Sequence, residues 1–418
     1  MSLVRSHAQV GHDLASGVHA VSQATTAFAV TQAAYRFFNN KNISLCSLAA
    51  PLLAHARVRV PQVCGEYLLV VHDWSQLMYR AHQHKQQRVE LSSLHLPEGY
   101  EILSSLAVSD SDGLPIAPLT LQLRATDGVH CTTGDVRPAL SPLDELAPTM
   151  NFIEQQQLGR PAVHIIDAEA DSVGHYREWT AGGQLFLVRA DDRLVEYHGV
   201  ERKTSQLQAD LQAQGAFQFT REILYHGKRA QQFVAEVPVR LLRAAQRNRP
   251  KAGDRQRIPG PPCALRLVLV EARTPTGQLL ATWFLLTNVS ADVAASQIAL
   301  WYYWRWNIES FFKLLKSGGQ QLEEWRQTKP EATARRLLVA SMACVVVWDL
   351  ASSKHPRAEE ARALLVKLSG RLIKRGKKFT LPAMLAGLWV LLAMLQTLEE
   401  YSLEDLQELS RIILENPP

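Results

Sequence analysis

Cysteine is scarce in this sequence and is not arranged for cross-linking or for zinc binding. The 418 residues include five cysteines, an odd number, and no two of them form a C-x-x-C pair. Disulfide frameworks and zinc sites usually show paired cysteines at short spacings. We therefore expect reduced thiols in a cytoplasmic protein that has no zinc site.

Long apolar runs and a strong excess of charge are also missing. The most apolar run, residues 381–395, is shorter than the roughly 20 residues that span a bilayer, so we expect a buried helix there and no membrane partner. Residues 1–30 lack the charged start and apolar core of a signal peptide. The net charge of +5 permits a polyanionic partner without requiring one.

The composition that remains is that of an ordinary globular protein. Hydrophobic residues make up 47% of the chain and charged residues 20%, and the length suggests two or three domains. Residues 1–60 look helical, with Ser44 as the predicted N-cap of a helix after a turn. Arg5 is the only lysine or arginine before Arg36, so phosphate binding by this region has little electrostatic support.

Two short apolar strands each lead to an aspartate. Residues 67–71 predict a buried strand that delivers Asp73 at its end, and residues 162–167 predict another that ends in Asp167. Between them the sequence predicts a hairpin at 99–125 and the tail of a helix at 150–159. A lone aspartate at a strand end is more often a turn or cap residue than a catalytic one.

The residues around and after the second aspartate continue this alternation of elements. We expect Asp171 to cap a following helix, Glu169 to face solvent, and residues 184–190 to form another strand. Residues 192–283 predict short strands and no helix of any length, with hairpins at 221–242 and 264–288. The segment 243–262, with six basic residues and four prolines, is either a solvated linker or an arm that follows phosphates.

A helix predicted at 301–320 carries a charged stripe. At about 100° per residue, one face collects Tyr302, Arg305, Glu309, Lys313 and Lys316. The opposite face is apolar and predicts a contact with the core through Trp304, Ile308, Phe311, Leu314 and Leu315. Spacing alone also fits a solvated face with ion pairs from Arg305 to Glu309 to Lys313. The rest of the chain is predicted to be helical, with a core helix at 331–353 and terminal helices at 382–398 and 403–414.

The pattern Tyr302-x2-Arg305-x3-Glu309-x6-Lys316 resembles the YREK signature of the insertion-sequence-4 family of DDE transposases, cut-and-paste enzymes that include the transposon-five transposase. The segments HDWS at 72–75 and DAEAD at 167–171 resemble the first and second aspartate motifs of that family. Ala168 departs from the pattern, because relatives often carry arginine there. Residues 33–44 resemble part of the family's N-terminal DNA-binding domain.

The resemblance implies an α/β architecture, a ribonuclease-H-like catalytic domain with a β-rich insertion and helical domains on either side. The implied boundaries are 1–62 for the DNA-binding domain, 63–191 and 283–353 for the two parts of the catalytic core, 192–282 for the insertion and 354–418 for a dimerisation domain.

The resemblance also implies a site. Asp73, Asp167 and Glu309 would be the catalytic carboxylates and would hold Mg²⁺, with Mn²⁺ able to substitute, since two-metal cleavage needs carboxylates converging on ions about 4 Å apart. DNA contacts would come from Tyr302, Arg305, Lys313, Lys316, Arg189 and Trp283. Trp283 would stack on a base, although a tryptophan in a hairpin more often belongs to the core.

The implied function is cut-and-paste transposition by a dimer that bridges two double-stranded DNA ends. Hydrolysis would nick each transposon end, the released 3′-OH would form a hairpin on the opposite strand, and a second hydrolysis would precede strand transfer into target DNA. The alternative is a shortened or domesticated relative that binds ends or partners and inhibits transposition without cutting. The three acidic residues favour the enzyme, whereas the cation-poor N-terminal region favours the inhibitor.

Overall fold

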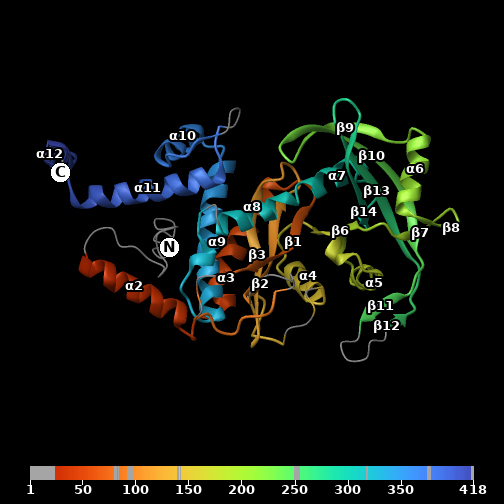
Figure 1. Cartoon of the computed structure of the whole chain (residues 1–418), viewed down its shortest axis with the longest axis horizontal. Coiled ribbons are helices and arrows are strands. Elements are labelled where there is room, and N and C mark those ends of the chain that lie inside the picture. Colours follow the sequence, from red (N-terminus) through yellow and green to blue (C-terminus); the bar gives the residue numbers. More distant parts are fainter. Residues whose placement is uncertain are drawn as a thin grey trace.

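The computed structural model of the chain describes residues 24–79, 82, 84–91, 98–138, 141, 143–248, 255–316, 319–373 and 378–415. Helices lie on both sides of a single large sheet (Figure 1). The helices in chain order are α2 (Ala24–Asn39), α3 (Leu45–Val63), α4 (Leu146–Gln155), α5 (Val173–Ala181), α6 (Thr204–Ala213), α7 (Ala295–Tyr303), α8 (Trp306–Leu315), α9 (Pro330–Ser352), α10 (Ala358–Leu368), α11 (Leu381–Glu400) and α12 (Leu403–Glu415).

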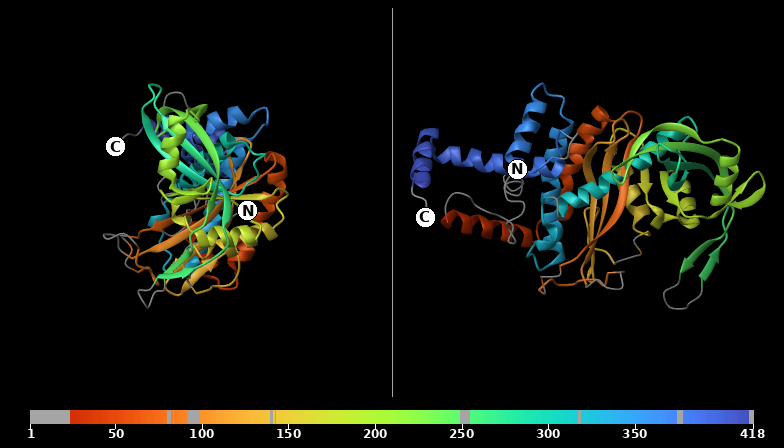
Figure 2. Two further views of the ribbon diagram at one scale, coloured as in Figure 1. Left: turned by 90° about the vertical axis from the view of Figure 1, so that its right-hand side faces the viewer. Right: turned by 45° about the horizontal axis from the view of Figure 1, so that its top comes forward.

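The sheet has 12 strands in the order β4-β3-β2-β1-β5-β6-β14-β13-β10-β7-β8, with β9 also paired to β10. Its strands are β1 (Leu68–Leu77), β2 (Tyr100–Ser109), β3 (Pro115–Ala125), β4 (Gly128–Cys131), β5 (Ala162–Ile166), β6 (Leu185–Ala190), β7 (Leu194–Tyr197), β8 (Val200–Lys203), β9 (Gln218–Tyr225), β10 (Lys228–Leu241), β13 (Cys263–Arg273) and β14 (Leu279–Thr287). A separate ribbon of β11 (Ala245–Asn248) and β12 (Arg255–Ile258) projects from the body (Figure 2).

The half of the sheet formed by β1 to β6 has the predicted α/β topology. Strand β2 pairs antiparallel with both β3 and β1, and β5 and β6 then run parallel to β1. Three antiparallel strands followed by two parallel ones is the strand arrangement of a ribonuclease-H-like fold, so the predicted fold class is confirmed. The hairpins expected at 99–125, 221–242 and 264–288 are also present as β2–β3, β9–β10 and β13–β14.

Alternating side chains of the central strands build two hydrophobic cores, one on each face of the sheet. In β5, Val163 and Ile165 join the core beneath α3, α8 and α9, whereas Ile166 joins the core beneath α4, α5 and α6. Successive side chains of a strand point to opposite faces, so both faces of β5 are covered. Helix α9 is buried along most of its length, as the sequence predicts for a core helix.

The region between β6 and β14 contains a helix that the sequence does not predict. Residues 204–213 form the ten-residue helix α6, although short strands without any helix are expected there. Buried Leu207 and Leu211 lie four positions apart and pack on the sheet, while Gln208 and Gln212 donate hydrogen bonds to the buried carboxylate of Glu271. Tertiary contacts of this kind stabilise a helix whose own hydrophobic pattern is weak.

Helix α11 is not the buried helix that the sequence predicts. It runs for 20 residues, and its buried residues Ala383, Met384, Leu385 and Gly387 all lie near its start. The rest of the helix extends away from the body, on the same side of the molecule as α2 (Figure 1). By length and composition alone it is the one helix in the described part of the chain that could cross a membrane, a test that core helices also pass.

Candidate active site

The two strand-associated aspartates lie side by side because β1 and β5 are parallel neighbours. Their register ends with His72 opposite Ile166, so Asp73 and Asp167 are the next residues on each strand. Asp167 follows β5 directly, as predicted. Asp73 does not end its strand, because β1 continues to Leu77 through its pairing with β2. The expectation of a strand end is wrong there, but Asp73 does mark the end of the parallel pairing.

A buried chain of polar side chains ties these strands together beneath the aspartates. Thr120 donates a hydrogen bond to Ser105 (2.7 Å), and Ser105 is 2.9 Å from Nδ1 of His72. Nε2 of His72 lies 2.8 Å from Nδ1 of His164 on β5. Burial lowers the pKa of both histidines, so the two rings are neutral and can form one continuous donor–acceptor chain across β3, β2, β1 and β5.

Each aspartate is fixed in the same way. Oδ1 of Asp73 accepts a hydrogen bond from the backbone N–H of Trp74 (2.8 Å), and Oδ1 of Asp167 accepts one from the N–H of Ala168 (2.7 Å). This local bond holds one oxygen of each carboxylate against its own backbone. The remaining oxygens, Oδ2 of each residue, both face the guanidinium of Arg305, as described below.

The charged stripe comes from two helices rather than from the single helix predicted at 301–320. Helix α7 ends at Tyr303 and α8 begins at Trp306, and the backbone between them tightens through i to i+3 hydrogen bonds, such as Ile308 N to Arg305 O (3.1 Å). Trp304, predicted to be core, is only partly buried at this junction. The predicted burial of Ile308, Phe311, Leu314 and Leu315 is confirmed.

The β2–β3 turn holds the junction in place. The carbonyl oxygen of Gly113 accepts a hydrogen bond from Nδ2 of Asn307 (2.7 Å). Gly113 has φ +71°, and a Cβ atom added to it would lie 2.4 Å from the ring of Trp304. A side chain would therefore be strained and would also collide with the indole. This close contact places Arg305 and the start of α8 opposite the aspartates.

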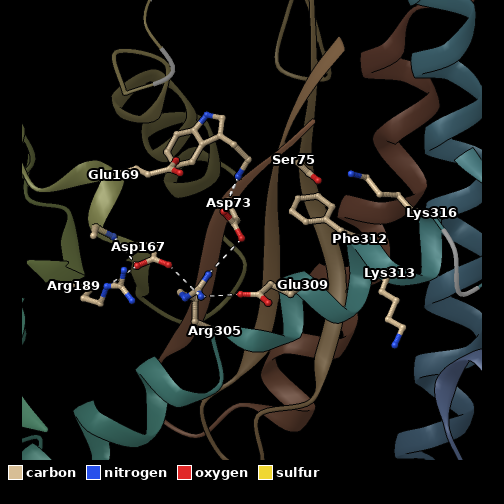
Figure 3. A pocket seen from close by; sticks show the side chains of 12 residues that line it. Asp73, Ser75, Asp167, Glu169, Arg189, Arg305, Glu309, Phe312, Lys313 and Lys316 are labelled. Carbon is tan, nitrogen blue, oxygen red and sulfur yellow. Dashed lines mark hydrogen bonds and ion pairs between the residues drawn. The ribbon is translucent and has the colours of Figure 1, made fainter. Parts of the chain in front are cut away.

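Arg305 joins the three predicted carboxylates (Figure 3). Its Nη1 lies 3.4 Å from Oδ2 of Asp73, and its Nη2 lies 3.2 Å from Oδ2 of Asp167 and 2.8 Å from Oε1 of Glu309. The side chain of Arg305 is only 7% exposed. The predicted pair of Arg305 with Glu309 is present, and a single guanidinium bridges acidic groups from β1, the end of β5 and α8.

Asp167 has two further partners among the predicted residues. The hydroxyl of Tyr302 donates to its Oδ1 across 3.1 Å, and Nε of Arg189, on β6, lies 2.9 Å from the same oxygen. Burial and the charge of Asp167 raise the pKa of Tyr302, so its phenol stays protonated and able to donate. The structure therefore brings Tyr302 and Arg189 to the carboxylates.

The two lysines of the stripe have different surroundings. Lys316 donates to the backbone carbonyl of Gln76 and lies 3.8 Å from Oε1 of Glu323, and burial lowers its pKa. Lys313 is exposed and points away from the carboxylates (Figure 3). Both line the same open cavity of about 520 Å³ as the carboxylates. No ion pair joins Glu309 to Lys313 in the described part of the chain, so that part of the predicted row of pairs is absent.

Glu169 is exposed, as the sequence predicts, but it is not among the site residues predicted from the sequence. It lines the cavity beside Asp73 and Asp167, and burial together with the charge of Asp167 raises its pKa. Its position two residues after Asp167 is the signal that could have identified it. Ser75, Trp74 and Phe312 also line the cavity and carried no such signal.

Asp171 and Trp283, two other residues with predicted roles, do not line this cavity. Asp171 does not cap α5, whose N-cap is Ser172; instead it pairs with Arg193 and accepts a hydrogen bond from the hydroxyl of Tyr176 (2.8 Å). Trp283, on β14, lies outside this cavity and lines a neighbouring aromatic hollow of about 380 Å³. The Trp283 ring is 6.4 Å from that of Tyr302, so the hollow adjoins the carboxylate site.

The donor set suits a hard divalent cation in type. Carboxylate oxygens are the ligands that Mg²⁺ and Mn²⁺ prefer. Burial raises the pKa of Asp73 to about 6, although the charge of Arg305 acts in the opposite direction. As the side chains stand, no group of three acidic, histidine or cysteine residues in the described ranges is arranged to hold an ion. The guanidinium of Arg305 lies at the point where their oxygens meet.

Comparison with known proteins now adds to this geometry. The family described as "Transposase DDE domain" matches residues 115–346, a range that includes Asp167 and Glu309 and begins after Asp73. No curated protein matches the chain. Among solved structures, the chain is similar to the cryo-EM structure of the piggyBac transposase synaptic complex with hairpin DNA. The TM-score is 0.41 and the sequence identity 10%, and the match covers 96% of this chain and 72% of that one. Because the family match spans more than half of the sequence, the protein belongs to the transposase DDE domain family.

Proposed function

We propose that this protein is a cut-and-paste DNA transposase of the insertion-sequence-4 type, in which Asp73, Asp167 and Glu309 are the catalytic carboxylates. One observation carries the proposal. Three acidic residues from distant parts of the chain, each expected at the site, all lie within 3.4 Å of a single guanidinium. Carboxylates gathered in this way at strand ends and on a facing helix are the arrangement that metal-assisted phosphodiester cleavage uses.

The same three residues would hold the divalent cation, Mg²⁺ or Mn²⁺, which in such enzymes activates water and polarises the phosphate. The side chains around them would position the substrate. The exposed Lys313 and the half-buried Arg189 both line the cavity and would bind phosphates of the cleaved strand. Lys316, fixed by Gln76 and Glu323, would hold the end of β1 and contact a neighbouring phosphate. Tyr302 would orient Asp167 and donate to the phosphate beside it.

Beyond the first cut, the proposal follows the steps implied by the YREK pattern. The released 3′-OH would attack the opposite strand to form a hairpin, and Trp283 would accept the base that this bend unstacks. The hairpin would then be reopened, and the same 3′-OH would join the element to target DNA. Two copies of the chain would bridge two inverted-repeat ends through the terminal helices α10 to α12, and the protein would act in the cytoplasm on the nucleoid.

The domain division expected from the sequence is part of this proposal. Helix α3 of the N-terminal region packs on the sheet through Leu52, Leu53 and Val60. The strands of the insertion at 192–282 extend the catalytic sheet without a break. We therefore propose that the five segments act as functional regions of one structural body.

A cleavage assay tests the proposal. Purified protein is incubated with Mg²⁺ and a duplex that carries the terminal repeat of its own element, which is found in the DNA flanking the gene. Site-specific nicks at the 3′ strand by the wild type, and none by Asp73→Asn, Asp167→Asn or Glu309→Gln, would support the transposase. Asp292→Asn, an exposed acidic residue outside the cavity, is the control and should cut normally. Tight binding of the duplex without cutting would favour the inhibitory relative instead.

A further inference from the structure

The position of Arg305 has a consequence for how the site takes up a metal. The three oxygens nearest to its guanidinium are Oδ2 of Asp73, Oδ2 of Asp167 and Oε1 of Glu309. In the two aspartates, this is the oxygen that does not accept the hydrogen bond from the following N–H group. The other oxygen of each aspartate is held by the following N–H group. Oδ2 is therefore the less occupied oxygen of each aspartate, and in both residues it faces Arg305.

A guanidinium and a divalent ion cannot share this position. Mg²⁺ binds carboxylate oxygens at about 2.0–2.1 Å. An ion held by Asp73, Asp167 and Glu309 would therefore compete for the oxygens that Arg305 now contacts. The ion would also lie within a few ångströms of the guanidinium, and like charges at that distance in a poorly solvated site repel strongly. Arginine does not lose its proton in proteins, so deprotonation of Arg305 cannot relieve this repulsion.

Within the part of the chain that the structure describes, the guanidinium of Arg305 also lacks one hydrogen-bond acceptor in this position. Nε of Arg305 is buried and has no hydrogen-bond partner in the described residues, although both terminal nitrogens are paired. A buried guanidinium N–H without an acceptor costs free energy, so the arrangement is not the best available once another acceptor enters the cavity. Phosphate oxygens are such acceptors.

We propose that Arg305 is a built-in counterion, which occupies the cation position of the metal-free site and has to be displaced when the metal binds. The inference rests on the proposed metal site. It assigns Arg305 two alternating roles: it neutralises the carboxylates before loading and becomes free to contact phosphate afterwards. By linkage, anything that draws the guanidinium away, such as a bound phosphate, raises the affinity for the metal by the same factor that the metal raises the affinity for it.

Metal binding measured without DNA tests this displacement. Mn²⁺ is titrated calorimetrically into the metal-free, full-length protein at pH 7.5, with no nucleic acid present. Arg305→Gln removes the competing charge and should bind Mn²⁺ about tenfold or more tightly than the wild type. Arg189→Gln is the matched control, because Arg189 contacts the outer oxygen of Asp167 and is more exposed. Its affinity should rise clearly less than that of Arg305→Gln.

Thermal unfolding in chelator and in Mn²⁺ provides a second readout. Arg305→Gln leaves three carboxylates without their shared cation, so its melting temperature in chelator should be lower than that of the wild type. Addition of Mn²⁺ should raise the melting temperature of Arg305→Gln by more than that of the wild type. Equal or weaker Mn²⁺ binding by Arg305→Gln, with binding still abolished by Asp167→Asn, would overturn the displacement alone. Saturable binding by neither protein would overturn the metal site itself and the displacement with it.

Discussion

The hydroxyl of Tyr302 donates a hydrogen bond to Oδ1 of Asp167 across 3.1 Å and so connects α7 to the carboxyl end of β5. The same oxygen accepts from the N–H of Ala168 and lies beside Nε of Arg189. Tyr302 therefore helps to fix which oxygen of Asp167 faces the cavity. Its ring also lies 6.4 Å from that of Trp283, so Tyr302 stands between the carboxylates and the tryptophan of the neighbouring hollow.

Removal of this hydroxyl should slow cleavage without unfolding the protein. Tyr302→Phe keeps the packing of the ring and loses one hydrogen bond to a charged group, worth roughly 1.5–3 kcal/mol, so we expect about a tenfold or greater fall in the nicking rate. Tyr303→Phe is the control, since the hydroxyl of Tyr303 bonds to the backbone of Leu224 outside the carboxylate site. Equal rates for the two variants would exclude a role of Tyr302 in orienting Asp167.

The metal-free protein should become less stable as the pH rises from about 4 to about 6, because of Asp73. Burial raises the pKa of this carboxyl to about 6, whereas its unfolded value is near 3.9, so the folded state binds the proton more tightly over that range. Stability from this group is present at low pH and decreases as the pH rises through about 6, by at most about 3 kcal/mol. Urea unfolding in chelator, compared between wild type and Asp73→Asn at several pH values, measures the difference. A difference that stays constant from pH 4 to pH 7 would contradict the raised pKa.

Trp283 should matter for the hairpin step and not for the first nick. Stacking of a base on an indole is worth about 1–3 kcal/mol, so Trp283→Ala should slow hairpin formation by roughly tenfold or more, and Trp283→Phe should recover part of the rate. Hairpin and nick products are separated on a denaturing gel. Equal slowing of both steps, or a large fall in melting temperature, would instead show that Trp283 acts as a core residue between Tyr225 and Tyr302.

Gly113 should tolerate no side chain, although it lies outside the cavity. In Gly113→Ala the Cβ atom would push against Trp304 and the residue would keep an unfavourable positive φ, at a cost of about 1 kcal/mol or more from the backbone alone. Trp304 precedes Arg305, so we expect lower melting temperature and slower cleavage together. Gly134→Ala, where no atom lies within 4 Å of the added Cβ, should change neither. Normal cleavage by Gly113→Ala would mean that the junction adapts without moving Arg305.

Much of the site could be predicted because its residues lie at short, regular spacings or at the ends of apolar segments. Asp167 follows β5 directly, and Arg305 and Glu309 lie one turn apart, so local geometry alone brings them into register. The apolar run at 67–71 predicts a strand that ends at Asp73. In the structure the residues after Asp73 stay in the strand, since β2 pairs with them. Pairing between segments distant in sequence leaves no local signal.

The features that were missed depend on tertiary contacts in the same way. Helix α6 is held to the sheet by the buried Glu271, which no pattern within residues 204–213 indicates. The break between α7 and α8 depends on the β2–β3 turn, nearly two hundred positions earlier in the chain. Position along the chain shows which side chains share a face, but not that the partner of three carboxylates would be an arginine on the same stripe.

The continuity of the sheet bears on how the chain avoids aggregation. Strand β6 is covered on one side by β5 and on the other by β14, which begins at the end of the insertion and continues beyond it. Removal of the insertion together with β14 would leave β6 with a row of unpaired backbone N–H and C=O groups, and exposed edges of that kind template pairing with other chains. An excised catalytic half would therefore be prone to self-association. The inserted strands protect the fold from this by covering an edge that would otherwise be exposed.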